Sequence, residues 1–266
     1  MLRGASAEAR AELVSQVGSS GTLEDKATLG DQLLGVADVL RSEAALRRVF
    51  TDASIEGEAK AGLAGNVFAG KIEDKALDLV KVAVQQRWTG SRDLAAVLEE
   101  LGVQALVRSA GAQGSRVSDE LFAVAQLIDA NPDLRGALSD PARADDDKVA
   151  LLGSVLQGKV LPATQRLVGH AVRADVPVGR ALEGIQLVAS EVQEELLAVV
   201  HTARPLGTTE ITRLTQALGK AYSTTVHLHV VEDPALIGGL RVEIGDDVID
   251  GSVSTKLDTA RRRIAG

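Results

Sequence analysis

Apolar residues recur at helical spacing through most of the first 200 residues. Leu29, Leu33, Val36, Ala37 and Leu40 form one such stripe, which is typical of a helix that packs one face against a core. The pattern predicts a helix over residues 6–17 and five more near 24–41, 43–50, 56–69, 72–87 and 91–108.

The helical pattern repeats after 88 residues without a gap. The repeat predicts five further helices near residues 115–130, 132–138, 145–157, 160–175 and 178–196, whereas the helix over 6–17 is expected to have no second copy. Identical pairs include Asp31/Asp119, Leu33/Leu121, Leu46/Leu134, Lys60/Lys148, Gly70/Gly158, Lys71/Lys159 and Arg92/Arg180. Such a fixed step indicates a duplicated helical unit, and residues 111–115 are the predicted linker.

The last quarter of the chain changes to a period of two. Val226, Leu228 and Val230 alternate with polar residues, as in a half-buried strand. Residues 240–244 alternate again, and Gly245-Asp246-Asp247 predicts the turn of a hairpin. A closing amphipathic helix is expected after residue 253. The fold class is therefore mainly α, with an N-terminal six-helix bundle (1–110), a second, duplicated helical domain (111–197) and a small α/β domain (198–266).

Composition excludes several kinds of partner. Aromatic residues are 2% of the chain, and nucleic-acid grooves need basic patches with stacking aromatics. Residues 201–266 carry eight basic and eight acidic side chains, so the net charge of −8 falls on residues 1–200, with 29 − 8 = 21 basic against 37 − 8 = 29 acidic. No apolar run reaches the roughly 20 residues of a membrane span, and the N-terminus lacks the apolar core of a signal peptide. We expect a soluble cytoplasmic protein without direct membrane insertion.

Two segments, residues 65–72 and 153–160, match the G-x-x-x-x-G-K pattern of a phosphate loop. In a phosphate loop, Ser or Thr follows the Lys and a strand precedes the first Gly. Here Ile72 and Val160 follow the Lys, and helical patterns precede the glycines. The preferred interpretation is that Gly70 and Gly158 end two short helices, so no nucleotide cofactor is expected.

The remaining polar clusters also have ordinary interpretations. His227 and His229 lie on one strand face and could reach a common metal, but two polar residues on an edge strand fit equally well. Asp246, Asp247 and Asp250 suit a turn better than a calcium loop. The chain has no Cys and no G-x-S-x-G element. No catalytic, cofactor-binding or metal-binding residue is predicted.

Trp88, the only Trp, ends a predicted long helix. It is expected to be a core residue, with an interface anchor as the alternative.

The C-terminal block resembles the delta subunit of bacterial rotary ATP synthases, the oligomycin-sensitivity-conferral protein of mitochondria. The motifs that carry the resemblance are Ala198–Leu206, Asp233-Pro234, Ile237–Val242, Gly245-Asp246, Val248–Ser252 and Leu257. Removing one 88-residue copy leaves a chain of the usual family length, so the sequence is similar to actinobacterial members with a second helical domain.

The resemblance implies a non-catalytic peripheral-stalk, or stator, subunit at the cytoplasmic face of the cell membrane. Such a subunit sits on the alpha and beta subunits of the catalytic hexamer and links them to the membrane-anchored b subunit. In the family, the N-terminal helices of alpha bind a groove between the first and fifth helices of the bundle. The matching positions here are Leu13, Val14, Val17, Ala76, Val80 and Val84, for which plain bundle core is an equal alternative. The family usually has an aromatic residue in the first helix, and this chain has none there.

The C-terminal domain is expected to bind the b subunit mainly through apolar residues. The candidates are Leu236, Ile237, Ile249 and Leu257, some of which must also serve the small domain's own core. Two alternatives remain for the chain as a whole: a helical-repeat adaptor of unrelated function, and a nucleotide-dependent enzyme built on the repeated glycine motif.

Overall fold

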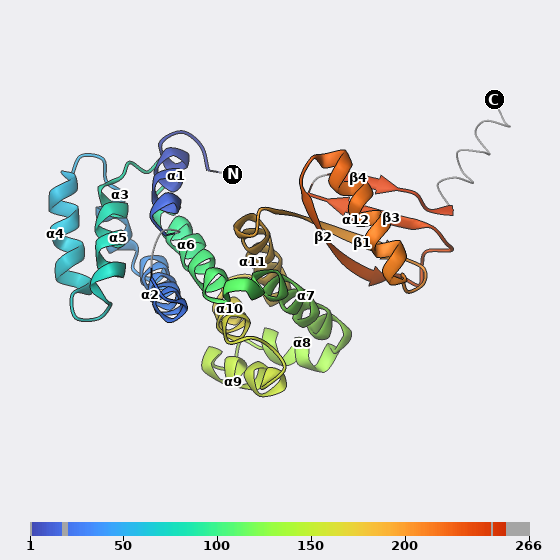
Figure 1. Ribbon diagram of the computed structural model, residues 1–266. Coiled ribbons are helices and arrows are strands. Elements are labelled where there is room, and N and C mark those ends of the chain that lie inside the picture. The colour runs from blue at the N-terminus through green and yellow to red at the C-terminus, as the bar shows by residue number, and fades with distance from the viewer. Residues whose placement is uncertain (1, 18–20, 246, 254–266) are drawn as a thin grey trace, which may run out of the picture. The chain divides into compact units, whose positions relative to one another are not determined.

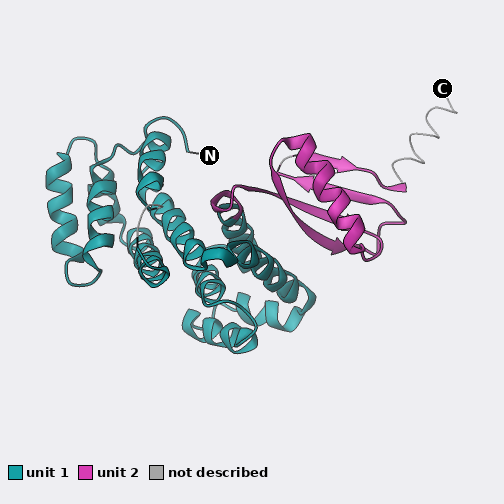
Figure 2. Cartoon of the chain, viewed as in Figure 1, with its two compact units in different colours: residues 1–189 teal, residues 190–266 magenta. Residues whose placement is uncertain are grey.

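The computed structural model describes residues 2–17, 21–245 and 247–253, which form two compact units, residues 1–189 and 190–266 (Figures 1 and 2). The first unit is helical, and the second holds a four-stranded sheet with one long helix. The predicted fold class, mainly α with a small C-terminal α/β domain, is confirmed. The division of the helical part near residue 110 stays a prediction.

Eleven α-helices precede the first strand in the described residues, and only the end of the last one passes residue 189 into the second unit. Their bounds are α1 (Ala5–Val17), α2 (Leu23–Ser42), α3 (Ala44–Thr51), α4 (Gly57–Phe68), α5 (Asp74–Gln85), α6 (Asp93–Ser109), α7 (Gly114–Ala130), α8 (Pro132–Ser139), α9 (Asp145–Leu156), α10 (Pro162–Arg173) and α11 (Val178–Val192). The connection between α6 and α7 is a single 3₁₀ turn, η1 (Gly111–Gln113), which lies within the predicted linker at 111–115.

Local sequence signals set several helix ends. Thr22 caps α2, because its side chain accepts a hydrogen bond from the Asp25 amide at 3.1 Å while the Asp25 carboxylate accepts one from the Thr22 amide at 2.7 Å. Gly70 and Gly158 follow α4 and α9, both at φ +72°. This left-handed conformation favours glycine and ends a helix.

The 88-residue step also relates α1 to α6, so the expectation that the first helix has no second copy is wrong. Residues 5–17 move onto 93–105, inside α6, and Glu12/Glu100 and Leu13/Leu101 are identical pairs. The helical unit therefore contains two overlapping six-helix bundles. We call α1–α6 the first bundle and α6–α11 the second bundle, with α6 common to both.

The burial of α6 explains how one helix serves two bundles. Eleven of its residues are buried, including every position from Leu101 to Val107. A helix that is apolar on all sides must be covered on all sides, and α6 packs against α1, α2 and α5 of the first bundle and against α7 and α10 of the second.

The crossing of α2 and α6 is unusually close. A Cβ atom added at Gly30 would lie 2.9 Å from the backbone oxygen of Gly102, and one added at Gly102 would lie 3.0 Å from the backbone oxygen of Gly30. The two helices therefore meet through their backbones, which only glycine permits at these positions.

The second unit is a mixed sheet with strand order β2-β1-β3-β4. Its elements are β1 (Glu195–Thr202), α12 (Thr208–Tyr222), β2 (Thr225–Glu232), β3 (Leu240–Ile244) and β4 (Asp247–Asp250). β1 and β2 pair in parallel through the α12 crossover, whereas β3 and β4 form the predicted hairpin. Ala198, Val200, Leu218, Val226, Val242 and Ile244 make its core. The expected closing helix lies outside the described residues.

Candidate partner-binding surfaces

The six predicted groove positions of the first bundle lie in or against its core. Leu13, Val17, Ala76, Val80 and Val84 are buried, and Val14 is partly buried against them. The structure therefore brings α1 and α5 together as the sequence indicates. It shows these residues packed on one another, and their contact with a partner stays a prediction.

Polar contacts close α1 over α6. The Ser6 hydroxyl donates to the Asp93 carboxylate at 2.7 Å and accepts the Thr89 amide at 2.7 Å. The Arg10 guanidinium Nε lies 2.8 and 2.7 Å from the two carboxylate oxygens of Glu100. Such a paired arrangement fixes the direction of the guanidinium as well as its distance.

Polar side chains join the first bundle to the helices α7–α11 at Glu99. Its carboxylate contacts Arg41 of α2 and lies 2.7 Å from Nε2 of the buried His170 of α10. Burial alone would raise the pKa of Glu99, but the hydrogen bond with His170 and the charge of Arg41 outweigh it, so this pKa lies below its ordinary value of 4.5. Arg166 and Asp31 form a second ion pair between α10 and α2 at 3.3 Å.

A groove of about 330 Å³ runs along the second bundle between α6 and α11 and reaches the end of α10. Most of its lining is apolar, and Glu99, Glu100, His170 and Arg180 are the polar residues in it. Sequence reasoning missed this groove, because it treated α6 only as the last helix of the first copy.

The repeated glycine motifs do not form phosphate loops. In both, the first Gly lies inside a helix, α4 or α9, and the second follows the end of that helix. A phosphate loop instead leads from a strand into a helix whose N-terminus faces the phosphate.

The predicted b-subunit contacts of the second unit differ in exposure. The side chain of Ile237 is 81% exposed and that of Ile249 is 44% exposed, whereas Leu236 is half-buried. Val248, next to Ile249 on β4, is also exposed. Leu236 and Ile237 lie in the loop before β3, whereas Val248 and Ile249 lie on β4 of the β3–β4 hairpin. Leu257 lies outside the described residues.

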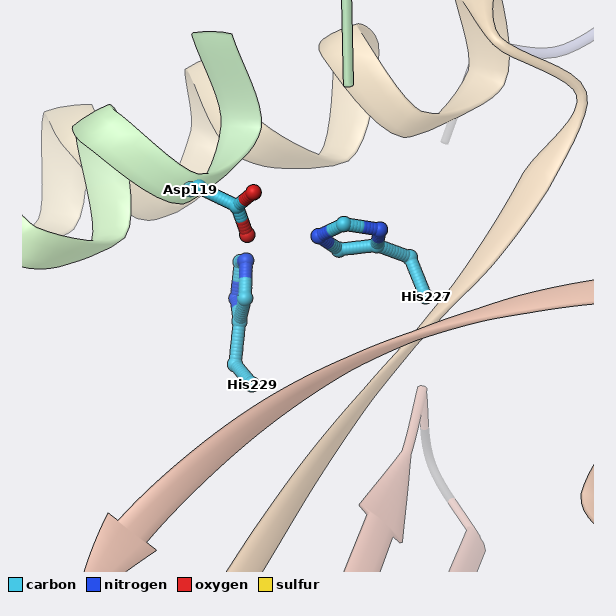
Figure 3. A group of neighbouring side chains, drawn as sticks. All are labelled: Asp119, His227 and His229. Carbon is cyan, nitrogen blue, oxygen red and sulfur yellow. The ribbon is translucent and has the colours of Figure 1, made fainter. Parts of the chain in front are cut away.

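His227 and His229 project from β2, an edge strand of the sheet (Figure 3). Their ring centroids are 5.1 Å apart with the rings nearly perpendicular, and His227 Nδ1 lies 3.5 Å from the Glu195 carboxylate of β1. Asp119, also labelled in the figure, belongs to the other unit. Two imidazoles are fewer ligands than a structural metal site uses, and we infer no metal site from this pair.

Comparison with known proteins decides the family. The family model for the ATP synthase delta (OSCP) subunit matches residues 103–264. The chain is 51% identical to ATP synthase subunit delta of a Nocardioides species, over 100% of this chain and 98% of that one. It is 40% identical to subunit delta of Streptomyces avermitilis, over 99% and 97%. The chain belongs to the ATP synthase delta (OSCP) family.

Among solved structures, a chain of the Toxoplasma gondii mitochondrial ATP synthase hexamer is similar at 18% identity. The match covers 62% of this chain and 95% of that chain, with a TM-score of 0.37. The match to the family model, by contrast, begins inside α6. It thus spans α7–α11 and the second unit, and it leaves out α1–α5. No helix of the described residues is long and apolar enough to cross a membrane.

Proposed function

We propose that this chain is a non-catalytic stator subunit of a proton-translocating ATP synthase. The observation that carries the proposal is the full-length similarity to delta subunits, together with a helical unit and a separate small α/β unit. In this role the chain ties the catalytic hexamer to the membrane-anchored b subunit, so that the hexamer does not turn with the rotor.

A stator joint needs binding surfaces that hold under torque rather than reacting groups. The helical unit suits that requirement, because its two bundles share α6 and are joined by the contact between His170 and Glu99 and by the ion pair between Arg166 and Asp31. A shared helix removes the flexible linker that would let two domains swing apart. The helical unit would bind the N-terminal helices of the alpha subunits in a groove, next to the beta subunits of the hexamer.

The small unit would bind the b subunit through its exposed apolar residues. Ile237 is the best placed contact, since an isoleucine with 81% of its surface exposed gives little to the unit's own core. The chain would then lie at the cytoplasmic face of the cell membrane, held there by its partners.

Co-purification tests this function. A tagged copy of the chain, expressed in its own organism and purified from gently solubilised membranes, should bring down the alpha, beta and b subunits together. Recovery of an unrelated set of proteins, with those three missing, would favour a helical-repeat adaptor instead.

A further inference from the structure

We propose that a cavity at the start of α4 binds a carboxylate anion. The cavity has a volume of about 250 Å³ and lies where the first turn of α4 meets the end of α5, its neighbour in the first bundle (Figure 1). Its lining includes Glu56, Gly57 and Lys60 at the start of α4, with Arg87 and Trp88 after α5. We call it the Lys60 cavity. The inference does not depend on the proposed function.

Lys60 is a buried cation of this cavity without a partner. The residue is 4% exposed, and its ammonium group forms no hydrogen bond or ion pair with any described residue. Side chains on a helix lean toward its N-terminus, so Lys60 extends over the first turn of α4 and lines the cavity. Burial lowers the pKa of Lys60, and the charge of Asp52 offsets this only in part. A buried cation is costly unless it is paired, so an anion bound here would stabilise it.

The start of α4 offers further groups that attract an anion. No side chain caps the helix at Glu56, and the first amides of a helix have no partner within it. These amides and the positive end of the helix dipole favour negative charge. Arg87 is an exposed second cation in the lining, and Glu56 is its only carboxylate among the described residues. This balance suits an anion with a single charge.

The second bundle shows what completes such a site. The 88-residue step places Asp145 and Lys148 of α9 at the positions of Gly57 and Lys60 of α4. Nζ of Lys148 lies 3.1 Å from the Asp145 carboxylate. The lysine of the second bundle thus has a carboxylate from its own helix, whereas Gly57 has no side chain that could supply one to Lys60.

The two helix starts are otherwise held in the same way. In the first bundle, the Gln85 side chain of α5 donates a hydrogen bond to the Glu58 carboxylate of α4 at 3.0 Å. The corresponding residues of the second bundle are Arg173 and Asp146, whose side chains lie 2.9 Å apart. The repeat therefore keeps the frame around the lysine and removes only its carboxylate, which identifies the class of ligand.

Trp88 provides the measurement, because it is the only Trp in the chain and lines the Lys60 cavity. It is buried in the core of the first bundle and donates its indole N–H to the Ala83 carbonyl at 2.9 Å. Sodium acetate is titrated into the full chain, with sodium chloride keeping the ionic strength constant. We expect a saturable change in Trp88 emission in about the millimolar range. Acetate should also raise the midpoint of thermal unfolding, since it binds the folded chain.

Three variants locate the binding site. Lys60→Met keeps the length of the buried side chain without its charge and should weaken acetate binding at least about tenfold. Gly57→Asp transfers the carboxylate of the second bundle and should abolish the response to acetate. A Cβ atom at Gly57 would lie 3.3 Å from Cγ of the flexible Gln85 side chain, which can shift to accept it. Lys148→Met is the matched control, and its affinity should stay within about twofold of wild type.

The source of the carboxylate is tested with N-acetylglutamate amide, whose only carboxylate is that of a side chain. Tighter binding of this probe than of acetate would support the site and indicate an acidic side chain of a protein partner, whereas weaker binding would support it and indicate a small free acid. Equal responses to acetate in wild type and Lys60→Met would overturn the carboxylate site. So would a wild-type chain in which acetate changes neither Trp88 emission nor the unfolding midpoint. Either result would leave the stator role intact.

Discussion

At the scale of single residues, Gly30 and Gly102 control how closely α2 and α6 can pack. A methyl group at Gly102 would lie 2.8 Å from Cγ of Leu34, besides its contact with the Gly30 carbonyl. Gly102→Ala should lower the free energy of unfolding by about 1–3 kcal/mol, as overpacking does in other cores. Gly35→Ala, in open space on α2, is the control and should raise it by about 0.5–1 kcal/mol. Urea unfolding measures both, and equal effects would show that the close crossing is not required.

Glu99 gives a prediction on pH at the same scale. Its pKa in the folded chain lies below the ordinary 4.5, so its stabilising effect is fully present above that value and is lost as pH falls through the folded pKa. The difference in unfolding free energy between wild type and Glu99→Gln should thus be larger at about pH 6 than at about pH 3. Asp38→Asn alters a more exposed partner of Arg41 and should change stability little at either pH. A Glu99→Gln difference that does not fall with pH would count against the ion cluster.

At the scale of elements, α6 is the central member of the helical unit. Leu13 and Leu101 are counterparts in α1 and α6, and both are fully buried. Each Leu→Ala change should cost about 2–5 kcal/mol. Hydrogen exchange followed by mass spectrometry distinguishes the two variants, because opening of a shared helix exposes the helices on both of its sides. Leu101→Ala should speed exchange in α1–α5 and in α7–α11, whereas Leu13→Ala should speed it mainly in α1–α5. Equal patterns for the two variants would mean that the bundles are not linked through α6.

Most of the elements could be predicted from the sequence, and the reasons are visible at particular residues. The Thr22 cap, the glycines at 70 and 158 and the alternation at 240–244 are local signals, and the structure follows each of them. The double use of α6 could not be read from periodicity, because an apolar stripe does not say how many neighbours it has. The sequence signal that could have revealed this double use was the pair of identities Glu12/Glu100 and Leu13/Leu101 at the 88-residue step. The groove between α6 and α11 was missed for the same reason.

At the scale of the whole molecule, the small unit is predicted to hold the b subunit by apolar contact. Ile237→Asp places a charge on an exposed side chain, so the unit should stay folded while binding of the soluble part of b weakens about tenfold or more. Thr209→Asp adds the same charge at an exposed position of α12 and should bind as the wild type does. Binding should also vary little with salt, since residues 201–266 carry equal numbers of acidic and basic side chains. A steep salt dependence, or normal binding by Ile237→Asp, would show that the b subunit binds through other residues of the chain.

The stator role is tested most directly by ATP-driven proton pumping in inverted membrane vesicles prepared with and without this chain. Without a joint between the hexamer and the b subunit, ATP hydrolysis can turn the hexamer against the rotor without moving protons. The account predicts that vesicles lacking the chain pump no protons while the hexamer still hydrolyses ATP, and that adding the purified chain restores pumping. Pumping that proceeds at the full rate in vesicles shown to contain none of the chain would contradict it.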